Sequence, residues 1–185
     1  MFRRIAVALV ALGLTGCGAL APDTDDEAGP VRRTLLIDHA SGTTSRAHCT
    51  VVADPFGDGG NVIEGERLED GRHKTSFFND NGFFVVPDEW DGVVVARLAV
   101  RGSRKLRIAL VSETGKLKSY YVDAPGAGRW CELRLPLPHV AGRIRVGEKI
   151  VDVSIWQLAQ GRPGGLFVDR IWLVRPAAGS SGTAR

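Results

Sequence analysis

The chain has 185 residues, of which 44% are hydrophobic and 24% charged, and its formal net charge is +3. This length suits one domain with a full hydrophobic core. Residues 1–16 contain two arginines, so the remainder carries only +1, which removes the main electrostatic argument for nucleic acid as a partner. After residue 16, no apolar run approaches the length of a membrane span.

Residues 1–16 have the layout of a secretory signal peptide, with a basic start, an apolar stretch and small residues at its end. The apolar residues 5–14 would form about 15 Å of helix, half of the roughly 30 Å that a membrane span needs. Residues 14–17 (Leu-Thr-Gly-Cys) resemble the lipobox of bacterial lipoproteins. The resemblance implies a lipid on Cys17, a membrane partner through that anchor, and a domain in the cell envelope outside the cytoplasm. The alternative is an ordinary cleaved signal followed by an incidental cysteine.

Both ends of the remaining chain have the composition of unstructured segments. Residues 17–33 are small and acidic and contain two prolines, which predicts a flexible linker between the lipid and the domain. Residues 176–185 are rich in Ala, Gly and Ser, which predicts a disordered tail. The folded domain is therefore expected at residues 34–175.

The domain alternates short apolar segments with turn residues. Apolar and polar residues alternate at 106–110 and 130–137, as in strands with one buried face, and the triplet at 79–81 (Asn-Asp-Asn) favours a hairpin. We expect strands at 35–37, 47–52, 74–78, 82–86, 93–100, 106–110, 118–122, 130–137, 151–158 and 166–174. No convincing amphipathic helix is present. The pattern predicts an all-β fold, an antiparallel β-sandwich of the jelly-roll kind.

The three cysteines are an odd number for an exported chain. If Cys17 carries a lipid, Cys49 and Cys131 remain as a pair in a compartment that permits disulfides. Each has apolar neighbours at alternate positions, which places both sulfur atoms on the core side of their strands. We therefore expect a Cys49–Cys131 disulfide; the alternative is two buried free thiols.

Four segments of the domain carry a family likeness when taken in order. Residues 36–38 end an apolar pair in an aspartate, and residues 89–93 lead into a long apolar run. Residues 128–137 begin with Gly-Arg-Trp before a sharply alternating strand, and residues 167–173 enclose an aspartate between apolar residues. Together they resemble the galactose-binding-like β-sandwich of many carbohydrate-binding modules. The resemblance implies this fold and a carbohydrate as the partner.

The same resemblance implies a structural calcium ion, which many members bind where the first and last strands lie side by side. Asp38 and Asp169 are the matching positions. Calcium takes six to eight oxygen ligands, so these two carboxylates alone do not complete a site. The alternative is that Asp169 accepts hydrogen bonds from backbone groups or pairs with an arginine.

The resemblance also implies aromatic side chains that stack on sugar rings, and the candidates are Tyr120, Tyr121 and Trp156. Adjacent residues of a strand point to opposite faces, so at most one of the two tyrosines is buried. Trp156 shares its parity with Ser154, which predicts that it faces away from the core. Trp130 and Trp172 are expected in the core. The alternative is that the aromatic rings are scattered and pack beneath loops.

The familiar enzyme motifs for hydrolases, zinc peptidases and phosphate binding are absent from the sequence. Carboxylates are concentrated between residues 54 and 91, and a pair of them acting on a glycan is the enzymatic alternative, as in a small jelly-roll hydrolase or lyase. Solvated loops are the simpler explanation of these acids. A structural envelope protein with a protein partner is the remaining alternative. We expect a non-catalytic, lipid-anchored module that binds carbohydrate.

Overall fold

The computed structural model describes residues 31–40, 44–57, 59–86, 92–137, 144–158 and 164–176. Within these ranges all regular elements are β-strands. The described part contains no helix long and apolar enough to cross a membrane. The strands are β1 (Val31–Asp38), β2 (Ser45–Ala47), β3 (Cys49–Ala53), β4 (Asn61–Arg67), β5 (His73–Phe78), β6 (Phe84–Val85), β7 (Val93–Arg101), β8 (Lys105–Ser112), β9 (Leu117–Asp123), β10 (Trp130–Pro136), β11 (Lys149–Gln157) and β12 (Gly165–Pro176).

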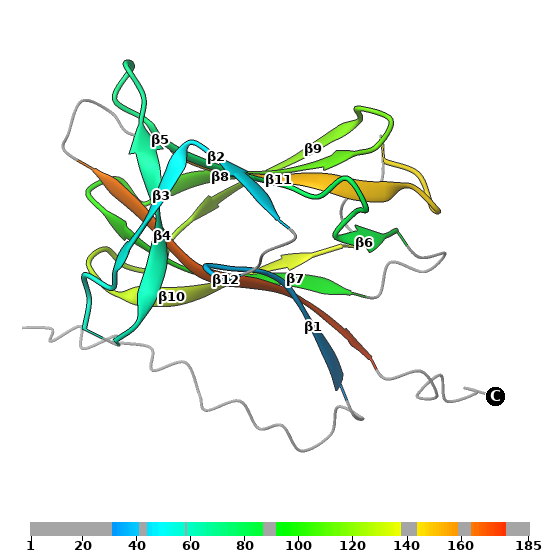
Figure 1. Ribbon diagram of the computed structural model, residues 1–185, viewed down its shortest axis with the longest axis horizontal. Helices are drawn as coiled ribbons and strands as arrows, with labels where there is room; N and C mark the ends of the chain where they lie inside the picture. Colours follow the sequence, from blue (N-terminus) through cyan, green and yellow to red (C-terminus); the bar gives the residue numbers. More distant parts are fainter. Residues whose placement is uncertain are drawn as a thin grey trace, which may run out of the picture.

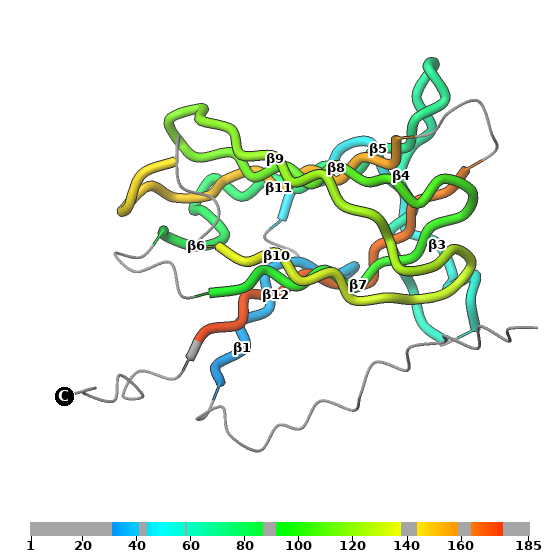
Figure 2. The backbone as a smooth tube through the Cα atoms, turned by 180° about the vertical axis from the view of Figure 1, so that it is seen from behind, coloured from blue at the N-terminus to red at the C-terminus, as the bar shows by residue number. Residues whose placement is uncertain are grey.

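The strands form two layers that pack face to face (Figures 1 and 2). Sheet A has the order β3-β4-β12-β7-β10, and β1 pairs with the part of β12 that β4 does not reach. Sheet B has the order β5-β11-β8-β9, with β2 beside β5 and β6 beside β11. All of these pairings are antiparallel, which confirms the predicted all-β antiparallel sandwich.

The ends of the described chain pair with each other. Residues 31–33 of β1 pair with residues 174–176 of β12, so regular structure begins within the segment predicted as a linker and reaches the first residue of the predicted tail. Backbone hydrogen bonding along β12 orders these polar residues, which composition alone does not reveal. Cys17, the predicted signal peptide and residues 177–185 lie outside the described residues.

The chain passes between the two sheets at one corner. β4 pairs with β12 and β3 in sheet A, and its last residues Glu66 and Arg67 pair with β5 in sheet B. A Cβ atom on Gly65 would lie 3.0 Å from the carbonyl oxygen of Lys74, so glycine allows this close approach. His48, between β2 and β3, has φ of 58°, an uncommon value outside glycine, and its carbonyl oxygen accepts a 2.8 Å hydrogen bond from the Glu66 amide.

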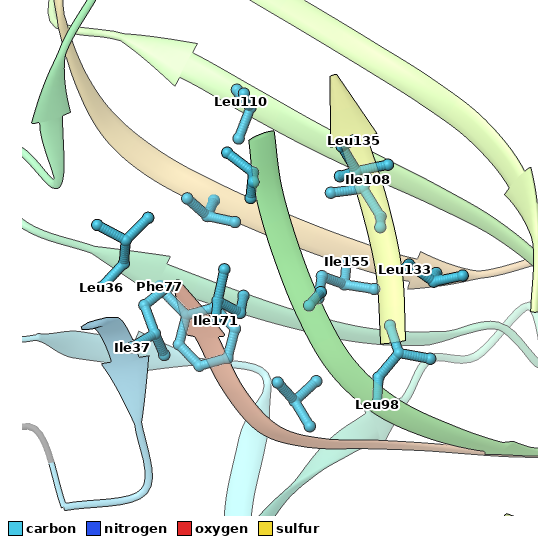
Figure 3. Packing of buried hydrophobic residues seen from close by; sticks show 14 of the residues in the cluster. Leu36, Ile37, Phe77, Leu98, Ile108, Leu110, Leu133, Leu135, Ile155 and Ile171 are labelled. Atoms are coloured by element: carbon cyan, nitrogen blue, oxygen red, sulfur yellow. The ribbon is translucent and has the colours of Figure 1, made fainter. Parts of the chain in front are cut away.

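The main hydrophobic core lies between the sheets and takes every second residue of the long strands. Sheet A contributes residues such as Leu98 and Ile171, and sheet B contributes Phe77, Ile108 and Ile155, all of them at most 1% exposed (Figure 3). Burying each of these side chains stabilises the fold by roughly 1.5–3 kcal/mol. Their alternation leaves the intervening side chains on the outer faces of the two sheets.

Two tryptophans expected in the main core lie instead on the outer face of sheet A. Trp130 packs edge-on against Phe56, with ring centroids 5.6 Å apart, in a small second cluster that includes Val62 and Phe167. Trp172 is 9% exposed and lies opposite Val95. The register of β12 shifts between Val168 and Arg170, and this bulge reverses the alternation that would have pointed Trp172 inward.

The predicted disulfide is wrong. Cys49 and Cys131 are both free thiols. Cys49 is on β3 and Cys131 is on β10, so four inter-strand spacings of about 4.8 Å separate their strands within sheet A, where a disulfide needs Cα atoms within about 7 Å. Both side chains pack against the main core, and burial raises the pKa of the Cys131 thiol.

Candidate functional site

The outer face of sheet B carries a row of long side chains that crosses four adjacent strands. Strand register places Lys74 of β5 beside Trp156 of β11, Trp156 beside Arg107 of β8, and Arg107 beside Tyr121 of β9. We call these four residues the aromatic row. The two aromatic residues belong to strands two positions apart, so about 9.6 Å separates their backbones across the sheet.

Three cations surround the indole ring of Trp156. The ring centroid lies 4.5 Å from Nζ of Lys74, 5.0 Å from the guanidinium carbon of Arg72 and 5.9 Å from that of Arg107. Such contacts are worth about 0.5–1 kcal/mol each at exposed sites. They hold the ring in place beside groups that donate hydrogen bonds.

A second row, of small residues, lies next to the aromatic row. We call this row, which crosses the same four strands, the serine floor: Ser76, Ser154, Ala109 and Ser119. Ser76 and Ser154 are 0% and 6% exposed although they face away from the core. Their hydroxyl oxygens are 3.0 Å apart, and Arg107 Nε donates to the Ser119 hydroxyl at 3.1 Å.

A third row bounds the serine floor on its other side and contains Phe78, Asp152, Val111 and Leu117. Successive rows are two residues apart along each strand, so the aromatic row and this third row stand about 13 Å apart. Phe78 and Leu117 are exposed, and larger side chains therefore flank a strip of small ones. We call the strip of small side chains on the outer face of sheet B, together with the two rows that flank it, the trough.

Asp152 supplies the carboxylate of the trough. Burial raises its pKa, while the hydrogen bond from Ser154 and the charge of Lys74 act in the opposite direction. The Ser154 hydroxyl donates to Asp152 Oδ1 at 2.8 Å, which links the acid to the serine floor. The trough thus offers acceptors at Asp152 and donors at Lys74 and Arg107.

A hollow of about 190 Å³ lies at the Tyr121 end of the aromatic row. Its lining includes Lys105, Tyr121, Asp123 and Leu158. Tyr121 is 70% exposed, so its ring is open to solvent. The cationic Lys105 and the anionic Asp123 line the same hollow. This combination of an exposed ring and polar neighbours extends the trough toward the edge of sheet B.

The two adjacent tyrosines that were considered as sugar-binding residues face opposite sides of sheet B. Tyr121 and Trp156 face outward in one row, in agreement with the parity argument for Trp156. Tyr120 points inward and packs against the main core, and burial raises the pKa of its hydroxyl. Lys74 and Asp152 were not predicted as site residues, because only the register of β5, β8 and β11 reveals that they share a face with Trp156.

The two proposed calcium ligands lie near the contact between β1 and β12. Asp38 is opposite Arg170, and its Oδ1 accepts a 2.9 Å hydrogen bond from the Ala40 amide. Asp169 Oδ2 lies 3.0 Å from Nε of Arg170 and 3.5 Å from Nε of Arg97. Among the described residues, no three His, Cys, Asp or Glu side chains gather as a metal-binding group. Two guanidinium groups beside one carboxylate do not fit a calcium ion, and we derive no function from one.

Three of the carboxylates considered for glycan cleavage make local contacts in the described part of the chain. Glu66 Oε2 lies 2.8 Å from His48 Nδ1, and Arg72 Nε donates to Asp70 at 2.7 Å. Asp54 accepts a 3.3 Å hydrogen bond from the indole of Trp130. The hollow that Asp54 lines measures about 100 Å³, well below the roughly 300–1,000 Å³ of small-molecule sites. These contacts give no support to a paired acid–base site; residues 58 and 87–91 lie outside the described ranges.

No protein-family model and no curated protein matches the sequence. Solved structures do match: CBM29-2, a family 29 carbohydrate-binding module, in a mutant form complexed with cellulohexaose, is similar over 78% of this chain and 91% of that one, with 13% identity and a TM-score of 0.50. The chain has a carbohydrate-binding-module fold. An exo-β-agarase is similar over 77% of this chain and 24% of its own length, with 10% identity and a TM-score of 0.51. PfGH50B is similar over 73% of this chain and 23% of its own, with 10% identity and a TM-score of 0.52.

Proposed function

We propose that the trough on the outer face of sheet B binds a carbohydrate chain, and that the protein is a non-catalytic binding module. Tyr121 provides a ring face on which a sugar stacks, and Trp156 forms the side of the trough. Lys74 and Arg107 donate hydrogen bonds to sugar hydroxyl groups, and Asp152 accepts them. The observation that carries the proposal is the placement of two aromatic rings in one solvent-facing row.

The geometry favours an extended, β-1,4-linked glycan. The spacing of about 9.6 Å between the backbones of Trp156 and Tyr121 is comparable with one disaccharide repeat of such a chain. The row crosses the strands, so a ligand lying along it would contact all four of them. The shared fold with a module complexed with cellulohexaose supports the same ligand class.

Isothermal titration of the full chain with cellohexaose, mannohexaose and an α-linked maltohexaose tests the proposal. We expect the β-linked oligosaccharides to bind and the α-linked one to bind more weakly, because only an extended chain reaches both rings. Tyr121→Ala should weaken binding roughly tenfold, as loss of an aromatic contact of more than about 1 kcal/mol predicts.

Tyr120→Phe is the matched control, since this neighbouring ring faces the core and the substitution removes only its hydroxyl. It should leave the affinity unchanged. If no β-linked oligosaccharide binds, or if both substitutions weaken binding equally, the trough is not the site.

We also propose that a lipid on Cys17 holds this module at a membrane of the cell envelope. The motif at residues 14–17 and its position behind an apolar stretch support the proposal. Cys17→Ala should move the protein from the membrane fraction to the soluble fraction. The mass of its N-terminal peptide should fall by the mass of the lipid. An unchanged mass and an unchanged fraction would contradict it.

A further inference from the structure

A second hollow, of about 380 Å³, lies on the outer face of sheet A, on the opposite side of the sandwich from the trough. Its volume falls within the roughly 300–1,000 Å³ range of small-molecule sites. Four strands contribute to the lining, which consists of Arg33, Leu35, Arg97, Glu132, Arg170 and Trp172. We call it the arginine hollow.

Two β-bulges on adjacent strands bring these side chains together. In β12, Asp169 and Arg170 together oppose the single residue Arg97 of β7, and this turns Trp172 outward. In β1, a register shift between Leu35 and Ile37 keeps Leu35 outward, opposite Trp172. Bulges re-aim side chains at such positions, so local irregularities of both strands build the arginine hollow.

The charges around the arginine hollow do not cancel. Arg97 and Arg170 share Asp169, and Glu132 lies directly opposite Arg97 on β10. Arg33 forms no ion pair with any residue in the described ranges. Three arginines and one carboxylate, Glu132, thus line the hollow, while Asp169 and Asp38 lie beside and opposite Arg170. The positive charge of the arginines is permanent because a guanidinium group does not lose its proton in proteins.

The rest of the lining is apolar. Trp172 is 9% exposed and Leu35 is 53% exposed, and strand register places them side by side. A bare inorganic anion would gain nothing from this indole and aliphatic surface. A ring with one apolar face and one carboxylate matches both parts of the lining, because a guanidinium group binds carboxylates through paired hydrogen bonds.

We propose that the arginine hollow binds an acidic sugar, with the carboxylate of a uronate unit at Arg33 and the pyranose ring against Leu35 and Trp172. This site is distinct from the trough and does not depend on it. The protein then holds two saccharides of different charge on its two faces.

Titration of the full chain with tetragalacturonate, in a sugar-free detergent at low salt, tests the proposal. We expect binding that weakens as salt is added, because the contact to Arg33 is electrostatic and partly exposed. Arg33→Gln should lower the affinity roughly tenfold, the effect of losing a charged hydrogen bond.

Arg32→Gln is the matched control, since Arg32 precedes Arg33 on β1, is also exposed, and points to the opposite face. It should leave the affinity for tetragalacturonate unchanged, and so should Trp156→Ala, which separates this site from the trough. A neutral galactose oligosaccharide of equal length should not bind. Together with the two unchanged affinities, this result would support the proposal.

Four outcomes would overturn it. The first is that tetragalacturonate does not bind, and the second is that Arg32→Gln and Arg33→Gln lower its affinity equally. The third is that inorganic phosphate at equal concentration displaces it. The fourth is that the protein binds phosphatidylserine vesicles through Arg33 in place of the uronate. The third outcome would mean an unspecific anion site, and the fourth a lipid-headgroup site.

Discussion

The outer faces of the two sheets are built from the same alternation and yet differ in chemistry. On sheet B, the four strands that form the trough keep one register across their three rows, so side chains of similar size line up. On sheet A, bulges in β1 and β12 interrupt the alternation and gather arginines around Trp172. The regular register of sheet B makes an elongated surface that suits an oligosaccharide. The irregular register of sheet A makes a local hollow that suits a single sugar unit.

The two faces also hold their carboxylates differently. Asp169 on sheet A is 14% exposed and sits beside two guanidinium groups, so its charge is compensated. Asp152 on sheet B is half-buried, and burial raises its pKa more than its neighbours lower it. Removing the negative charge should therefore have opposite consequences for stability on the two faces.

The largest expected effect concerns ligand binding at the trough. Trp156→Ala should weaken binding of cellohexaose roughly 30-fold, because it removes the side of the trough and the ring that holds Lys74 and Arg107 in place, a loss of about 2 kcal/mol. The affinity for tetragalacturonate, measured by the same titration, should stay unchanged. A parallel loss of both ligands would show that one face binds both.

A smaller effect is expected for the stability of sheet A. Asp169→Asn keeps the shape of the side chain but removes the charge that Arg97 and Arg170 share, so the free energy of unfolding should fall by about 1–3 kcal/mol. Urea denaturation measures it, and Asp80→Asn in the exposed loop before β6 is the control. If Asp169→Asn raised the stability, the two arginines would not depend on this carboxylate.

The smallest effect, and one of opposite sign, is expected for Asp152→Asn. In the native state the pKa lies above its ordinary value of 3.8, so the folded protein holds the proton to higher pH than the unfolded chain does. The stability of the wild type therefore decreases as pH rises from 3.8 through the raised pKa.

Asp152→Asn should remove that decrease and raise the melting temperature slightly at neutral pH, with the difference disappearing below pH 3.8. Ser154 still finds an acceptor, because the asparagine retains Oδ1. Melting curves at several pH values check this expectation. A lower melting temperature at neutral pH would mean that the ionised form of Asp152 is stabilised by its neighbours.

The face of many strand residues was predictable from local sequence. Alternation at 106–110 and 130–137 indicated strands with one buried face, and the shared parity of Trp156 and Ser154 placed that ring outside the core. These inferences succeed because the period of a strand is a property of its backbone and extends over only a few residues.

Which strands become neighbours was not predictable in the same way. Cys49 and Cys131 both point toward the core as expected, but their strands lie at opposite ends of sheet A. Trp172 was expected in the core because large rings usually fill it, but one extra residue at Asp169 reverses the alternation and turns this ring outward. Register and bulges depend on pairing between segments distant in sequence, and the rows of the trough depend on that same pairing.

The position of β12 has a consequence for how the molecule is made. This strand is the last of the described strands, yet it lies in the middle of sheet A and pairs with β1, β4 and β7. Until residues 165–176 emerge from the ribosome, one edge of β7 has no neighbour and β1 has no strand to join. Contacts between such distant segments slow folding. Half of the sandwich therefore stays incomplete, with exposed strand edges, until residues 165–176 are available for pairing.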